Sequence, residues 1–78
     1  MSTLVNGSID LVDQQRADAL KDEGNRLLSS GKIAQAIEKY TAAIAILPSA
    51  IYYSNRAQAL IKLESYGLAI IDANEALK

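Results

Sequence analysis

The chain contains no cysteine and no histidine among its 78 residues. Without cysteine it has no disulfide framework and no thiolate nucleophile, which is consistent with the reducing environment of the cytoplasm. Without histidine it lacks the commonest general base and a common metal ligand. We therefore predict that the protein is not an enzyme and needs no metal and no cofactor.

The carboxylates lack the clustering that catalysis requires. They stand singly on predicted helices, with lysines or arginines nearby, and we interpret them as solvated surface groups. These residues are Asp22, Glu23, Glu38, Glu64, Asp72 and Glu75. The glycines of the predicted helices and turns are far apart in sequence, so the chain has no glycine-rich phosphate loop.

The chain also has no large excess of positive or negative residues. Eight basic residues oppose nine acidic ones, for a net charge of −1. This balance argues against a nucleic-acid or membrane surface as the main partner. No apolar run approaches the roughly 18 residues that span a bilayer, and the first residues do not resemble a secretory signal. We expect a soluble cytoplasmic protein whose partners are other proteins.

The clearest pattern lies in residues 17–50. Apolar and small residues recur there at helical spacing in two segments, one on each side of Gly31. The first segment has Ala17, Leu20, Gly24, Leu27 and Leu28, and the second has Ile33, Ala36, Ile37, Tyr40, Ala43, Ile44 and Leu47. Gly31 suits a helix end because glycine tolerates a left-handed conformation, and Pro48 stops the second helix. Two short amphipathic helices joined this tightly are predicted to form a hairpin.

The same pattern returns 33 residues later. The shift aligns Ala17, Leu27, Ala36, Ile37 and Ala43 with Ala50, Leu60, Ala69, Ile70 and Ala76. A self-match at such a period indicates a repeat architecture. The sequence therefore predicts an all-α fold of two tandem antiparallel helical hairpins, with helices near residues 14–29, 33–46, 50–63 and 66–78.

The hairpins define the predicted domain, residues 13–78, with repeat one at 17–49 and repeat two at 50–78. Residues 1–12 hold no clear period, and we expect them to form a flexible tail. Serine and aspartate side chains accept hydrogen bonds from the free amides of a first helical turn. The predicted N-caps of the first, third and fourth helices are Asp13, Ser49 and Ser65.

The last predicted helix has an unpaired apolar face. Repeat arrays usually need about three units and a polar capping element, and the sequence shows neither a third repeat nor a capping helix. We therefore expect a fragment, or a truncated or engineered form, whose fourth helix exposes Ile70, Ile71 and Leu77. Because exposed apolar strips tend to become interfaces, we expect this face to support self-association into an oligomer.

A candidate binding cluster lies on the first helices of the two hairpins. Lys21 and Asn25 are four residues apart and share a face of the first helix. Asn55 lies on the third helix, which lines the same side of a stacked array. One ammonium and two amide groups make a donor-rich cluster suited to a carboxylate. The alternative is ordinary surface polarity, with the asparagines bridging neighbouring helices.

Both units resemble tetratricopeptide repeats, whose pattern runs Trp-x-x-Leu-Gly-x-x-Tyr, Ala-x-x-x-Phe and Pro. The matching positions are Leu20, Gly24, Leu27, Ala36, Tyr40 and Pro48 in the first unit and Tyr53, Ala57, Leu60, Ala69 and Ala73 in the second. The segments LKDEGN and YSNRA resemble the signatures of dicarboxylate-clamp co-chaperones. That resemblance implies that Lys21, Asn25 and Asn55 hold the C-terminal Glu-Glu-Val-Asp carboxylates of cytosolic heat-shock chaperones. The family takes a further lysine and arginine from a third repeat, so the clamp here is partial.

Within the family, the second unit resembles the N-terminal repeats of protein phosphatase five, and next the small glutamine-rich repeat co-chaperones. The predicted function is a protein-interaction module for chaperone C-terminal peptides. One alternative is a regulatory or targeting segment of a serine/threonine phosphatase whose catalytic domain lies elsewhere. Another is a repeat unit that mainly self-associates.

Overall fold

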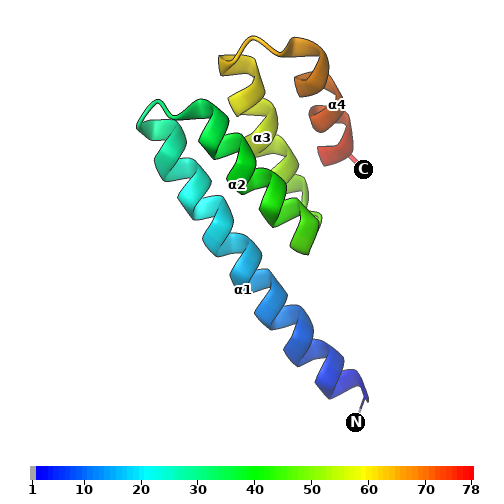
Figure 1. Ribbon diagram of the computed structural model, residues 1–78. Coiled ribbons are helices and arrows are strands. Elements are labelled where there is room, and N and C mark those ends of the chain that lie inside the picture. The colour runs from blue at the N-terminus through cyan, green and yellow to red at the C-terminus, as the bar shows by residue number, and fades with distance from the viewer. Residues whose placement is uncertain (1) are drawn as a thin grey trace.

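The computed structural model describes residues 2–78, with side chains from Leu11 onward. It contains four helices: α1 (Ser2–Ser29), α2 (Ile33–Ile46), α3 (Ala50–Lys62) and α4 (Tyr66–Ala76) (Figure 1). No strand occurs in this part of the chain. The predicted all-α fold of antiparallel hairpins is confirmed, and the starts of α2, α3 and α4 lie at the predicted residues.

The helices pack in sequence order. α1 lies against α2, α2 against α3 and α3 against α4, and α1 also touches α3. The N-terminal half of α1 extends beyond the other three helices (Figure 1). None of the helices within residues 2–78 is both long enough and apolar enough to cross a membrane.

Two buried clusters hold the hairpins together, and both use the predicted helix faces. One is built on Ala17, Ala43 and Tyr52, with Leu20, Ile44, Ile46 and Leu47 around them. The other is built on Ala36, Tyr40 and Ala59, with Leu27, Leu28, Ile33 and Ile37 around them. Each cluster includes a residue of α3, so α3 stabilises the first hairpin as well as its own.

The first helix begins earlier than the sequence pattern indicated. It runs without a break from Ser2, rather than from about residue 14, because no proline interrupts the backbone ladder before α2. The expected cap at Asp13 is therefore wrong. Asp13 lies inside α1, where its carboxylate is 3.7 Å from the Arg16 guanidinium. The flexibility of residues 1–12 and the domain boundary at residue 13 stay predictions.

The two hairpin turns have the same hydrogen bonds but different residues at their tightest point. In the first turn Gly31 has φ +80°, and Lys32 donates its N–H to the Leu27 carbonyl at 2.9 Å. In the second turn the equivalent residue is Glu64, at φ +62°, and Ser65 donates its N–H to the Leu60 carbonyl at 2.8 Å. Both are Schellman motifs. The second one places a glutamate in the left-handed region that glycine normally fills.

The two serine caps have different outcomes. Ser49 does cap α3, because its Oγ accepts from the Ile51 N–H at 3.3 Å. The cap predicted at Ser65 is wrong, since its side chain makes no such bond. The two serines differ in backbone conformation: Ser49 is extended, as capping residues usually are, at φ −149° and ψ 141°, whereas Ser65 has φ −93° and ψ 66°.

An ion pair joins the two helices of each hairpin, with the charges exchanged. In the first hairpin Lys39 of α2 is 3.2 Å from Glu23 of α1, and both side chains are well exposed. The residues 33 positions later are Asp72 and Arg56. Their pair is bidentate, with Arg56 Nε and Nη2 donating to the two carboxylate oxygens of Asp72 at 2.7 and 2.8 Å. The position of the pair is thus repeated while its polarity is reversed.

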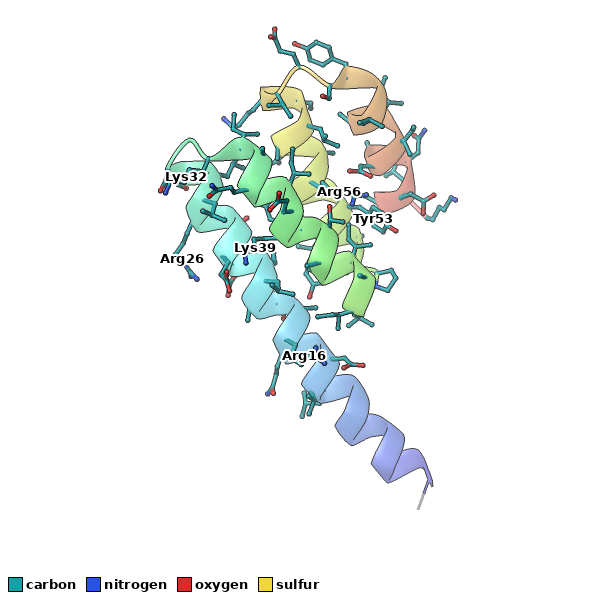
Figure 2. All side chains as sticks on the ribbon, viewed as in Figure 1. Arg16, Arg26, Lys32, Lys39, Tyr53 and Arg56 are labelled. Atoms are coloured by element: carbon teal, nitrogen blue, oxygen red, sulfur yellow. The ribbon has the colours of Figure 1, made fainter. Side chains whose placement is uncertain are left out.

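The pair in the second hairpin corrects the interpretation of Asp72 as a solvated carboxylate. Asp72 is 4% exposed, and Arg56 also donates to Thr41 of α2 at 3.0 Å. The pKa of Arg56 is raised, first by its hydrogen bond to Asp72. The guanidinium lies 5.6 Å from the centre of the Tyr53 ring, beside it on α3 (Figure 2). Arg56 therefore connects α2, α3 and α4.

The strained turn at Glu64 generates a stability prediction. Glu64→Gly should raise the free energy of unfolding by about 0.5–1 kcal/mol, because relief of left-handed strain exceeds the extra backbone entropy of glycine. Chemical denaturation of the two proteins measures the difference. Glu64→Ala is the matched control: it removes the same charge, keeps the strained conformation and should leave stability nearly unchanged. Equal gains in both variants would mean that the glutamate charge, not the backbone, limits stability.

Candidate functional site

The structure brings together two of the three predicted clamp residues. Asn55 of α3 donates from Nδ2 to Asn25 Oδ1 of α1 at 3.4 Å. Lys21 lies one turn before Asn25 on α1 and is half-buried. Its ammonium is 3.4 Å from the carboxylate of the neighbouring Asp22. Among the described side chains, Lys21 makes no hydrogen bond to either asparagine.

A second contact between α1 and α3 lies on the same side. The hydroxyl of Tyr52 on α3 donates to Asp18 Oδ1 on α1. Asp18 precedes Asn25 by seven residues, or two turns of helix, so both residues share one face of α1. Two side-chain hydrogen bonds therefore tie the first helices of the two hairpins together along the candidate site.

The side chain of Asn25 accepts a hydrogen bond from a buried tyrosine. The Tyr40 hydroxyl of α2 donates to Asn25 Oδ1 at 2.5 Å, and the Tyr40 side chain is fully buried. Burial also raises the pKa of Tyr40, so the hydroxyl remains protonated and able to donate. Oδ1 of Asn25 thus accepts from Tyr40 and from Asn55. The NH₂ group of Asn25 donates to no other described residue, and the side chain is exposed.

The Tyr40 ring reaches this position because Gly24 has no side chain. A Cβ at Gly24 would lie 2.5 Å from Cε1 and 2.8 Å from Cδ1 of the Tyr40 ring. The sequence analysis identified Gly24 and Tyr40 as packing positions, but it did not assign Tyr40 to the site. One signal was available: the family pattern has phenylalanine where this chain has tyrosine, and a buried hydroxyl requires a partner.

The site also carries negative charge, from Asp18 as well as from Asp22. The pKa of Tyr52 is raised to about 12, mainly by burial, and then by its hydrogen bond to Asp18 and by the charges of Asp18 and Asp22. Donors at Lys21, Asn25 and Asn55 therefore lie next to two carboxylates on α1. Within residues 11–78 no three acidic side chains gather in a way that would hold a metal ion.

Asn55 also borders an open depression at the end of the second hairpin. Its walls are Ala50, Ile51, Ser54, Asn55 and Ala76. Ile51 is 59% exposed there, which offers an apolar surface beside the amides. The arrangement places the Asn55 amide next to an apolar surface.

Comparison with known proteins finds relatives but no matching family model. Serine/threonine-protein phosphatase T of Aspergillus oryzae is 48% identical over 69 residues, which are 85% of this chain and 14% of that protein. Small glutamine-rich tetratricopeptide repeat-containing protein 2 of Saccharomyces cerevisiae is 42% identical over 69 residues, 87% of this chain and 20% of that protein. Human tetratricopeptide repeat protein 12 is 43% identical over 63 residues, 80% of this chain and 9% of that protein. The chain therefore spans a fifth or less of each of these curated relatives.

The contact between Gly24 and Tyr40 generates a paired prediction. Gly24→Ala should lower the free energy of unfolding by about 1–2 kcal/mol, because the methyl group overpacks a ring that cannot move, and helix propensity offsets only part of the loss. Thermal or chemical denaturation measures it. Gly67→Ala is the matched control, since Gly67 lies in α4 with no atom near its missing Cβ. That variant should gain about 0.5 kcal/mol. A Gly24→Ala variant as stable as Gly67→Ala would show that Tyr40 does not require glycine beneath it.

Proposed function

The chain is homologous to the tetratricopeptide-repeat proteins, and on this basis we propose that it is an interaction module for the acidic C-terminal tails of cytosolic heat-shock chaperones. The relatives confirm the resemblance to this family that Gly24, Ala36 and Tyr40 indicated. The choice of a chaperone tail as ligand is the proposal. It is supported by the contact between Asn25 and Asn55 across α1 and α3, with Lys21 one turn before Asn25 on α1.

The proposed mechanism is capture of a terminal carboxylate. The NH₂ group of Asn25 and the second N–H of Asn55 donate to the carboxylate oxygens of the ligand, and Lys21 contributes its charge. To do so, the Lys21 ammonium leaves the carboxylate of Asp22. Ile51 supplies an apolar contact for the last residue of the ligand or for the residue before it.

Binding by residues 1–78 alone is expected to be weak. The family resemblance implies five clamp residues, and the lysine and arginine of a third repeat have no counterpart in this sequence. Each charge-assisted hydrogen bond contributes about 1.5–3 kcal/mol. The affinity should therefore be about two to four orders of magnitude below that of a complete clamp.

Because one of the relatives is a phosphatase, the same module could also be part of a longer enzyme. In that setting the hairpins act as a regulatory or targeting segment, and a catalytic domain outside this sequence carries out the chemistry. We propose no catalytic role for the residues of this chain itself. We propose a cytoplasmic location, because the chaperone tails that the module would bind are found there.

The clamp is tested by calorimetric titration with a peptide that ends in Met-Glu-Glu-Val-Asp. Lys21→Ala and Asn55→Ala should each weaken binding at least tenfold, because each removes a donor to the carboxylate. Lys32→Ala is the matched control, because it removes the same charge at the turn between α1 and α2 (Figure 2). A peptide with an amidated C-terminus should not bind. Equal binding of the amidated peptide, or equal loss in Lys32→Ala, would contradict carboxylate capture.

Self-association is a second candidate function, favoured by the open face of the second hairpin. On this face Ile70 and Leu77 are 62% and 86% exposed. Ile71, which was expected beside them, is 58% exposed but lines a different hollow with Ile37 and Thr41 of α2. An apolar hollow on this face is lined by Ala57, Ile61, Tyr66, Ala69, Ile70 and Ala73. Shifted back by 33 residues, these become Gly24, Leu28, Ile33, Ala36, Ile37 and Tyr40. In the first hairpin most of that set packs in the cluster that includes Ala59 of α3.

We propose that a second copy of the chain covers this face through its own identical face. The opposite end of the molecule is unsuitable as the partner surface. It is lined by polar and charged groups that include Glu23, Arg26 and Lys39 (Figure 2). Head-to-tail stacking would bury those charges against isoleucine, whereas a two-fold pairing places apolar groups on apolar groups.

Sedimentation at increasing concentration tests this pairing. The wild-type chain should form a dimer whose affinity changes little with salt, because the contact is apolar. Ile70→Asp should be monomeric, since it buries an unpaired charge at the interface. Val12→Asp adds the same charge at a half-exposed position of α1 and should still dimerise. A wild-type chain that stays monomeric at millimolar concentration would exclude the pairing.

A further inference from the structure

The hydroxyl of Tyr40 is the one polar atom of the second buried cluster that reaches the candidate site. The ring is fully buried among Ala36, Ala59 and their neighbours, while the hydroxyl lies 2.5 Å from Asn25 Oδ1. Asn25 itself is exposed. A group in the core of the molecule is therefore bonded directly to a surface side chain.

This bond decides which way the Asn25 amide faces. The oxygen and nitrogen of an asparagine amide are nearly equal in size, and rotation by half a turn exchanges them. Both neighbours of the oxygen are donors, the Tyr40 O–H and the Asn55 N–H. If the nitrogen turned inward, the Asn55 N–H would face another N–H, and the Tyr40 hydroxyl would have to change from donor to acceptor. With the oxygen held inward, the two N–H groups face the solvent.

We propose that Tyr40 is a positioning residue for carboxylate binding, which holds the amide of Asn25 so that its NH₂ group faces the ligand. This inference rests on the proposed function of Asn25. A terminal carboxylate only accepts hydrogen bonds, so an amide that turns its oxygen outward repels it. Tyr40 removes that unfavourable orientation before the ligand arrives and lowers the ordering cost of binding.

Gly24 is part of the same arrangement. The ring stands directly against the backbone of α1 at Gly24, the residue before Asn25. This contact sets the distance between the hydroxyl and the amide. It also explains why the site depends on the core: the α1–α2 packing that stabilises the hairpin is the packing that orients Asn25.

The chain provides a matched control in Tyr52. Tyr52 is also buried, at 2% exposure, and its hydroxyl also donates to a side chain of α1. Its acceptor is Asp18, not a clamp residue. Tyr40→Phe and Tyr52→Phe therefore each remove one buried hydroxyl, but Tyr52→Phe also takes a donor from the Asp18 carboxylate beside the candidate site. Tyr52→Phe is therefore the control for the Asn25 signals and not for the affinity. Only the first should release Asn25.

The test combines peptide titration with NMR of the Asn25 side chain. Tyr40→Phe should weaken binding of the Met-Glu-Glu-Val-Asp peptide about three- to tenfold, the range set by one neutral hydrogen bond. In an Asn25→Ala background, Tyr40→Phe should have no further effect, because Tyr40 acts through Asn25. Without peptide, Tyr40→Phe should shift and broaden the Asn25 side-chain NH₂ signals, and Tyr52→Phe should not.

The outcomes separate this inference from the proposed function. Unchanged affinity in Tyr40→Phe, or unchanged Asn25 signals in that variant, would overturn the positioning role. An additive effect of Tyr40→Phe in the Asn25→Ala background would also overturn it. If the wild-type protein binds no peptide, the proposed function is wrong, and the NH₂ signals alone still decide whether Tyr40 orients Asn25.

Discussion

The packing of the Tyr40 ring against Gly24 is the contact on which the first hairpin and the candidate site both depend. It lets α1 and α2 approach closely, and it buries the largest side chain that is fully enclosed in the molecule. The same ring carries the hydroxyl that bonds Asn25. Because one side chain serves the core and the surface, a change that loosens the hairpin also changes the orientation of the proposed donor. Stability and binding are therefore coupled at this point.

The two repeats have the same backbone plan but are stabilised by different interactions. The second hairpin has Ala57 and Ala73 where the first has Gly24 and Tyr40, so it lacks the contact of a tyrosine ring with a glycine backbone. Its main polar link is the buried bidentate pair of Arg56 and Asp72, which also reaches α2. This pair has a specific geometry, and it holds α3 and α4 in one relative position. The hollow that remains on α4 is the apolar face proposed for self-association.

The candidate site and the open face lie on different parts of the molecule, and different types of interaction are proposed for them. The site is polar, and its proposed ligand is bound by directed hydrogen bonds from α1 and α3. The open face is apolar, and its proposed partner is held by removal of surface from water. Both arise from the same repeat, because stacking one hairpin on another lines up the first helices and leaves one outer face of the stack uncovered.

The sequence by itself determined the fold class, the four helices and the two packed faces, since these follow from local periodicity, from Gly31 and Pro48, and from the repeat of 33 residues. It also indicated that Asn25 and Asn55 share one side of the molecule. Only the tertiary structure decided the rest. The early start of α1 lies in a segment where the apolar residues show no clear period. The bonds of Tyr40 to Asn25, of Tyr52 to Asp18 and of Arg56 to the buried Asp72 join residues 15 to 34 positions apart. Such contacts depend on how the helices pack side by side, and the spacing of residues along one helix does not specify them.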